Sequence, residues 1–264
     1  MNLFSPHSLR IGLLGAGRVA SQLGPALVAA GHKVVFVWNR SAPAATALAA
    51  QLPGAQALAS LAAPLPPADV YLLAVPDAAV GPLVAGITWP GSALVAHLAG
   101  ALPLSVFDKQ PTVRGGVFYP LQTFSPGREI SWPAVPLCIE AHEAAAEATL
   151  LALASSLSQL VLRLDSDRRL KLHVAAVFAN NFTNHVLGIA DALLTEAGLP
   201  PALLAPLVRE TVDKALANPP FSVQTGPAVR QDLPTLAAHQ AALAAHPAWQ
   251  AIYAQLTASI RAQL

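Results

Sequence analysis

The chain has 264 residues, 54% hydrophobic and 11% charged, so it can form one or two domains with a sizeable core and little disorder. Its net charge is +1 without a basic cluster, which argues against a nucleic acid or an anionic membrane surface as partner. Cys138 is the only cysteine, which excludes an internal disulfide and fits the reducing cytoplasm, where we expect the protein.

The first predicted element is a short apolar strand, residues 9–14, followed by a turn and a helix that begins near Arg18. The turn has the dinucleotide-binding form G-x-G-x-x-A. Gly15 allows the tight bend, Gly17 lets a pyrophosphate approach the backbone, and Ala20 lets the helix pack closely on the strand. The helix N-terminus adds free N–H groups and a positive dipole end. We expect a nucleotide to contact the segment Gly15, Ala16, Gly17, Arg18, Val19 and Ala20; a turn without a ligand is the alternative.

The second predicted strand, residues 32–38, ends at Asn39, Arg40 and Ser41. NAD-dependent enzymes carry an Asp or Glu at this place to bind the ribose 2′-hydroxyl. No carboxylate stands here to repel a 2′-phosphate, and Arg40 and Ser41 can both bind phosphate oxygens. The three residues therefore predict NADP as the cofactor. In the alternative interpretation Arg40 is a solvated surface charge and Asn39 only turns the chain.

Strands and helices alternate through the remainder of the first half. After an alanine-rich helix to about residue 52, the predicted strands cover residues 55–58, 69–75, 92–98, 116–119 and 135–139, and a helix covers residues 141–157. This alternation predicts the α/β class, with a doubly wound, Rossmann-like parallel sheet. The charge-free stretch 78–107 is interrupted by prolines and glycines into strand-sized pieces, so we expect no membrane span.

The pattern changes near residues 164–167, where Asp and Ser are good helix caps. Only helices are predicted beyond this point, over residues 168–197, 202–217, 235–245 and 248–263. We therefore expect a Rossmann-like NAD(P)-binding domain in residues 1–164 and an all-helical domain in residues 165–264. The helical domain should close over the cofactor, contact the substrate and form a homodimer.

Several segments carry a resemblance: the glycine motif, Trp38–Ser41, His97–Gly100, Tyr119–Phe124, Cys138–Glu140, Lys171–Asn181 and Gly226–Asp232. Together they resemble a family, described only as oxidoreductases, that joins a Rossmann-like domain to a helical domain of unknown function. More distantly, the chain is similar to pyrroline-5-carboxylate reductase, ketopantoate reductase and deazaflavin-dependent NADP reductases, which share a 6-phosphogluconate-dehydrogenase-like helical domain and are usually dimers.

The hydroxyacid dehydrogenase branch uses a Lys followed four residues later by an Asn. Here Lys171 is followed by Ala175, so that chemistry is not implied.

The long predicted helix carries the candidate catalytic residues. At 100° per residue, His173, Asn180, Asn184 and Asp191 fall in one polar stripe, and Phe178, Phe182, Ile189 and Leu193 form an opposite, core-facing stripe. Asn181 lies between them, nearer the polar side. We expect His173 to give a proton to a substrate oxygen or nitrogen while a hydride arrives at the neighbouring carbon. Asn180 or Asn181 would orient the substrate or the carboxamide; a solvated stripe or a dimer contact is the alternative.

The remaining candidates follow predicted strands. Ala74, Val75 and Pro76, and likewise His97 and Gly100, stand at carboxyl ends of parallel strands, where open α/β sheets bind ligands, so we expect them along the cofactor. His97 could also act as a second acid, or it could be a packed, hydrogen-bonded side chain. We expect Tyr119, Pro120 and Arg230 at the substrate, with Arg230 holding a carboxylate. The alternatives are a simple strand end for Tyr119 and Pro120, and a surface pair of Arg230 with Asp232 or a helix-capping turn for Arg230. No Cys/His cluster has metal-ligand spacing, so no metal is expected.

These features predict an NADP-dependent oxidoreductase that reduces a C=O or C=N bond of a small, anionic metabolite. The alternative from another class is an NADP-binding regulatory or scaffold protein without turnover, which the missing Lys–Asn pair favours. A third hypothesis for the function is hydride exchange with a deazaflavin.

Overall fold

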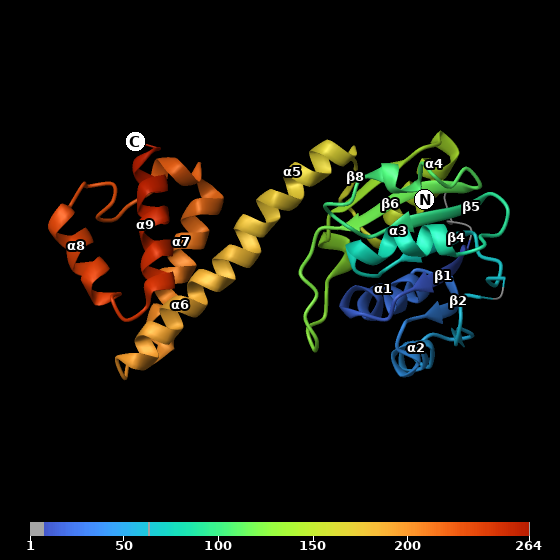
Figure 1. The fold of residues 1–264 in the computed structure, drawn as a ribbon, viewed down its shortest axis with the longest axis horizontal. Coiled ribbons are helices and arrows are strands. Elements are labelled where there is room, and N and C mark those ends of the chain that lie inside the picture. Colours follow the sequence, from blue (N-terminus) through green and yellow to red (C-terminus); the bar gives the residue numbers. More distant parts are fainter. Residues whose placement is uncertain (1–7, 63, 264) are drawn as a thin grey trace, which may run out of the picture. The chain divides into compact units, whose positions relative to one another are not determined.

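The structure is a computed structural model that describes residues 8–62 and 64–263. The chain divides into two compact units, the first ending at Asn180 and the second beginning at Asn181 (Figure 1). The first unit contains a sheet with helices around it. Within its described residues, the second unit consists of helices and loops.

The sheet of the first unit has eight strands in the order β3-β2-β1-β4-β5-β6-β7-β8. The strands are β1 (Arg10–Leu14), β2 (Lys33–Trp38), β3 (Gln56–Leu58), β4 (Val70–Leu73), β5 (Ala93–His97), β6 (Val113–Pro120), β7 (Leu137–Ala141) and β8 (Val161–Arg163). The first six form the parallel order of a Rossmann fold, which confirms the predicted fold class.

The sheet departs from the prediction at its far edge. Strand β7 runs antiparallel to β6, and β8, which the sequence did not predict, runs parallel to β7. The connection from β6 to β7 contains only the short 3-10 helix η2 (Trp132–Ala134). A parallel pair needs a crossover, usually an α-helix, whereas an antiparallel pair does not.

Helices cover both faces of the sheet, because each strand sends successive side chains to opposite sides. The helices packed on these faces are α1 (Arg18–Ala29), α2 (Ala42–Ala49), α3 (Asp77–Gly86), α4 (Ala144–Leu157) and the 3-10 helix η1 (Leu104–Phe107). Apolar residues of α1, α2 and α4 pack in one buried cluster with Leu13, whereas those of α3 and η1 pack in a second cluster with Leu14. Helix α3 was not predicted, since Gly81 and Pro82 in its middle have poor helix propensity.

Helix α5 (Ser166–Ala176), near the end of the first unit, begins at the predicted cap. The side chain of Asp165 accepts a hydrogen bond of 2.8 Å from the backbone N–H of Arg168. The prediction of one α-helix from residue 168 to 197 was wrong, because a π-helical segment, η3 (Val177–Phe182), follows α5. A π-helix closes i to i+5 hydrogen bonds and therefore widens the turn. The adjacent Asn180 and Asn181, both poor helix formers, lie in this segment.

The second unit contains α6 (Thr183–Glu196), α7 (Ala205–Ala217), α8 (Leu233–Ala242), α9 (Pro247–Arg261) and the 3-10 helices η4 (Pro201–Leu204) and η5 (Pro220–Val223) (Figure 1). Helices α6 and α7 both contact η4, and α8 contacts α9. None of the helices in the described part of the chain has the length and hydrophobicity of a membrane span.

Candidate functional site

The glycine bend lies between the end of β1 and the start of α1. Gly15 has a φ of +120°, and a Cβ on it would collide with the carbonyl oxygen of Ala74. Its backbone N–H donates a 2.6 Å hydrogen bond to the carbonyl of Trp38, so the bend is tied to the end of β2. Only glycine fits this backbone conformation at such a close approach.

Gly17 occupies the N-cap position of α1 and leaves the helix end open. Gly17 is exposed, and no side-chain hydrogen bond caps the helix at this position. A Cβ on Gly17 would meet no atom within 4 Å. The first N–H groups of an α-helix have no partner within the helix. Arg18 is also exposed and Ala16 and Val19 are half-buried, whereas Ala20 packs in the core. The bend therefore offers an anion both space and unpaired donors.

Asn39 connects the glycine bend to the end of β2. Its side-chain Oδ1 accepts a 3.2 Å hydrogen bond from the backbone N–H of Ala16, and its Nδ2 donates to the carbonyl of Ser41. Arg40 and Ser41 are exposed, and no side-chain hydrogen bond of either is found in the described parts of the chain. Asn39 thus has the turn-forming role of the alternative interpretation, while Arg40 and Ser41 stay accessible to a phosphate.

The ends of β4 and β5 place the next candidates at the same edge of the sheet. Ala74 and Val75 are half-buried, and Pro76 is the exposed N-cap residue of α3. The backbone N–H of Ala74 donates to the carbonyl of Leu14 at 2.7 Å, which places it next to the glycine bend. Gly100 lies in the loop after β5 and is buried.

His97 is the packed, hydrogen-bonded side chain of the alternative interpretation. It has no exposed surface and stacks on Phe107, with 5.8 Å between ring centroids. Its Nδ1 accepts a 3.2 Å hydrogen bond from the backbone N–H of Ala99. Burial, with a smaller contribution from the positive charge of Arg169, lowers the pKa of His97 to about 3. The ring is therefore neutral near pH 7, which does not suit a proton donor.

Three candidate residues from different elements meet beyond the end of β5. The hydroxyl of Tyr119, on β6, lies 3.1 Å from Nδ1 of His173, on α5, and the two rings meet edge to face at 5.9 Å. A Cβ on Gly100 would lie 2.5 Å from that Nδ1 and 2.8 Å from Cζ of Tyr119, so glycine is needed there. Tyr119 is 8% exposed, and its burial raises its pKa to about 12. Pro120 is buried at the end of β6.

A buried ion pair that sequence reasoning missed holds the start of α5. Arg169 is 1% exposed, and its Nη1 pairs with Oε2 of Glu140, at the end of β7. Its Nη2 donates 2.6 Å to the carbonyl of Leu102, in the loop that contains Gly100. Ser166 donates to Glu140 through both N–H and hydroxyl, and accepts a 2.9 Å hydrogen bond from the N–H of Leu104. These bonds fix α5, and with it His173, against the Gly100 loop.

The predicted polar stripe is broken by the π-helical segment. Seven residues complete about two turns of an α-helix, which is why His173 and Asn180 were predicted to share one face. The π-helical segment η3 has wider turns and includes Asn180, so this prediction was wrong. The apolar stripe was wrong as well, because Phe178 is 64% exposed and Phe182 50% exposed. Asn180, at the end of the first unit, and Asn181, at the start of the second, are both exposed.

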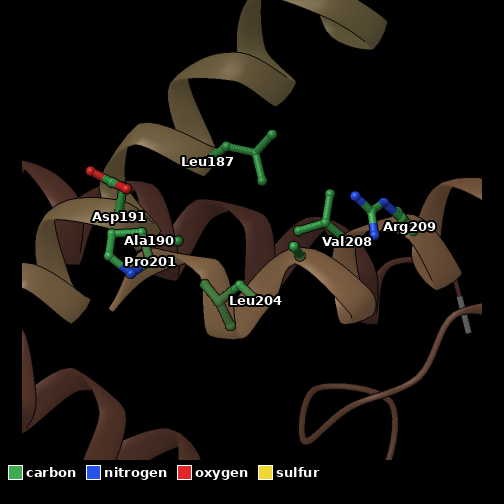
Figure 2. A pocket seen from close by; sticks show the side chains of 8 residues that line it. Leu187, Ala190, Asp191, Pro201, Leu204, Val208 and Arg209 are labelled. Atoms are coloured by element: carbon green, nitrogen blue, oxygen red, sulfur yellow. The ribbon is translucent and has the colours of Figure 1, made fainter. Parts of the chain in front are cut away.

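The second unit contains the other predicted substrate residue and a hollow of about 320 Å³ (Figure 2). Arg230 is exposed, while Asp232 caps α8 by accepting from the N–H and hydroxyl of Thr235. Leu187, Leu204 and Val208 line the hollow, with Asp191 and Arg209 at opposite ends. Asp191, from the predicted polar stripe, is one of its lining residues, whereas His173 is not. In the residues described for both units, no group of three or more His, Cys, Asp or Glu could hold a metal ion.

Two family models match the chain. A "Rossmann-like domain" matches residues 2–122, and a "domain of unknown function (DUF2520)" matches residues 135–260. No curated protein matches the sequence. These matches correspond to the two parts of the resemblance predicted from the sequence.

Solved structures resemble the chain over nearly its full length. A "putative NADP oxidoreductase" from Bacteroides fragilis is 39% identical, with a TM-score of 0.88, covering 96% of this chain and 98% of that one. A reductive aminase from Aspergillus terreus, in complex with NADPH and ethyl levulinate, is 20% identical, with a TM-score of 0.70 and coverages of 96% and 92%. A 1-pyrroline-5-carboxylate reductase from Streptococcus pyogenes is 13% identical, with a TM-score of 0.61 and coverages of 97% and 100%. The last two share the fold.

Proposed function

We propose that this chain, which belongs to the family that joins a Rossmann-like domain to the DUF2520 helical domain, is an NADP-dependent oxidoreductase. One observation carries the proposal: the N-terminus of α1 is exposed and uncapped behind a bend that only glycine can form. The relative from Bacteroides fragilis is described as a "putative NADP oxidoreductase", and the reductive aminase of the same fold is in complex with NADPH. Both descriptions agree with the cofactor expected from Arg40 and Ser41.

The residues along the sheet edge fit the parts of NADP in order. The backbone N–H groups at the uncapped start of α1, those of Arg18 and Val19, would hold the pyrophosphate. The guanidinium of Arg40 with the hydroxyl of Ser41 would hold the 2′-phosphate. The backbone from Ala74 to Pro76, next to the bend, would line the path to the nicotinamide. When bound, the reduced cofactor supplies a hydride.

His173 is the proposed proton donor. It is half-buried, and its Nδ1 is held by Tyr119, so the ring has a fixed position at the sheet edge. Its proton would pass to the oxygen or nitrogen of the substrate as the neighbouring carbon is reduced. Asn180 and Asn181 remain predicted substrate-orienting residues, since both amides are exposed.

The proposed substrate is a small, anionic metabolite with a C=O or C=N bond. The reductive aminase of the same fold supports the C=N bond. The exposed guanidinium of Arg230 is the predicted partner of a substrate carboxylate. The Arg230→Ala variant should raise KM for an anionic substrate with little change for an uncharged one.

The test combines binding with turnover. Wild-type protein should bind NADPH saturably and oxidise it with members of a panel of small keto acids, aldehydes and cyclic imines. His173→Ala should lower kcat by about 10² to 10⁴-fold with NADPH affinity unchanged. Lys171→Ala, on the same helix and exposed, is the matched control and should keep full activity. Binding without turnover on any substrate would favour the alternative of a non-catalytic NADP-binding protein.

We also propose the homodimer expected through the helical domain. Large apolar side chains are exposed on α6, η4 and α7 of the single chain, namely Val186, Leu187, Leu203, Leu207, Val212 and Leu216. Exposed apolar surface of this extent is typical of an interface. In sedimentation velocity, Leu207→Glu should shift a dimer toward monomer, whereas Leu162→Glu, an exposed leucine on β8, should not. A wild-type protein that is monomeric at micromolar concentration would contradict the proposed homodimer.

A further inference from the structure

We infer that Tyr119 is a positioning residue that determines which nitrogen of His173 exchanges a proton with the substrate. The Tyr119 hydroxyl is hydrogen-bonded to Nδ1 of His173, so Nε2 is the atom that donates the proton. The inference rests on the proposed function, because it assigns an atom and a supporting residue to the proton-transfer step. It starts from a contact between two residues 54 positions apart in the sequence.

The contact is held from three sides. Tyr119 is fixed on β6, whose neighbours β5 and β7 are both hydrogen-bonded to it. His173 is fixed on α5, whose start is bound by Arg169 and Ser166 to Glu140 and to the loop after β5. Gly100, in that loop, lies so close to both side chains that a Cβ would force the imidazole, the phenol ring or both to shift.

A hydroxyl suits this role in either charge state of the histidine, because it can accept a hydrogen bond from Nδ1–H or donate one to an unprotonated Nδ1. Since burial raises the pKa of Tyr119 to about 12, the phenol stays neutral while the imidazole gains or loses its proton. Nδ1 is thus engaged before and after the reaction. Within the chain as described, Nε2 of His173 has no hydrogen-bond partner, so it is free to meet a ligand.

The proton balance follows from this geometry. The imidazolium holds one proton on each nitrogen, with Nδ1–H donating to the oxygen of Tyr119. The Nε2–H bond breaks, its electron pair stays on the ring, and the proton forms a new O–H or N–H bond on the substrate. The hydride that reduces the adjacent carbon comes from the reduced nicotinamide cofactor. The imidazole is left neutral, with its remaining hydrogen still bound to Tyr119 through Nδ1.

The Tyr119→Phe variant tests the inference, because it removes the hydroxyl and keeps the ring. With all eight histidines ¹⁵N-labelled, and His173 assigned by its loss in His173→Gln, the Nδ1 resonance of His173 should shift in Tyr119→Phe. In the same variant kcat should fall by about 2- to 12-fold, the value of one hydrogen bond, while NADPH affinity stays within twofold. Gly100→Ala, measured by NMR without cofactor, should shift the same resonance by displacing the ring.

Tyr71→Phe is the matched control. The Tyr71 hydroxyl donates to the carbonyl of Pro66 and accepts from the N–H of Ala68, so both of its hydrogen bonds lie within the loop just before β4. This variant should leave both kcat and the His173 resonance unchanged. An unaltered Nδ1 resonance in both Tyr119→Phe and Gly100→Ala, or an unaltered kcat in Tyr119→Phe, would overturn the inference. If the Nδ1 resonance of His173 shifts in Tyr119→Phe as expected but the wild-type protein shows no turnover, the proposed function is refuted instead, and the proton-donor role of His173 with it.

Discussion

Replacing Arg169 with methionine should lower the free energy of unfolding by about 3 to 5 kcal/mol, the usual cost of removing one partner from a buried ion pair. Arg169 is 1% exposed and the side chain of Glu140 only 17%, so solvent screens the pair little. The variant leaves the Glu140 charge and the carbonyl of Leu102 without their main partner. Methionine has a similar length and no charge, so most of the loss is electrostatic and hydrogen-bonding rather than packing.

Arg163→Met is the matched control for this prediction. Arg163 pairs with Glu147 at 2.6 Å, but its side chain is 70% exposed, and such surface pairs contribute about 0 to 1 kcal/mol. The double variant Arg169→Met/Glu140→Leu should recover much of the loss, because no unpaired charge remains. Urea denaturation followed by tryptophan fluorescence measures all four proteins. If Arg169→Met costs no more than Arg163→Met, or if the double variant is the least stable, the reasoning is refuted.

Three further predictions concern single residues. Because an unfolded histidine titrates near 6.5 and folded His97 near 3, the unfolded state alone takes up this proton as the pH falls below about 6.5. His97→Gln should therefore reduce the loss of stability between pH 7 and pH 5 by about 2 kcal/mol; an equally acid-sensitive variant in urea titrations would contradict this. Arg40→Ala should weaken NADPH binding at least ~10-fold and NADH binding little; equal weakening of both in fluorescence titrations would remove Arg40 from the 2′-phosphate. Gly15→Ala should lower Tm strongly, since its φ is +120° and a Cβ would strike Ala74; an unchanged melting curve would argue against the tight bend.

Local signals predicted much of the fold. The bend at Gly15 and the cap at Asp165 were found because backbone conformation and capping depend on one or two residues each. The central strands were found because buried parallel strands are continuous apolar runs. By contrast, β8 has only three residues and depends on its pairing with β7, which no local pattern reports.

The site was less predictable because its contacts are long-range. His173 and Tyr119 were both candidates, but their pairing arises only when β6 and α5 are packed together. Arg169 was missed because its partners lie 29 and 67 positions away in the sequence. The expected stripe from His173 to Asn180 failed for a different reason, since helical-wheel geometry assumes one period throughout and cannot anticipate a π-helical turn.

The most direct test of the central claim is an NADPH titration of Gly17→Asp beside wild-type protein. Gly17 has a φ of −84°, is exposed, and occupies an N-cap position that aspartate favours, so the variant should fold with an equal or higher Tm. Its carboxylate would occupy the helix N–H groups and repel a pyrophosphate. We predict saturable binding of NADPH to wild-type protein and binding at least ~100-fold weaker to the variant. Equal affinity of the two proteins, or no saturable binding by the wild type, would contradict the assignment of the glycine bend as the cofactor site.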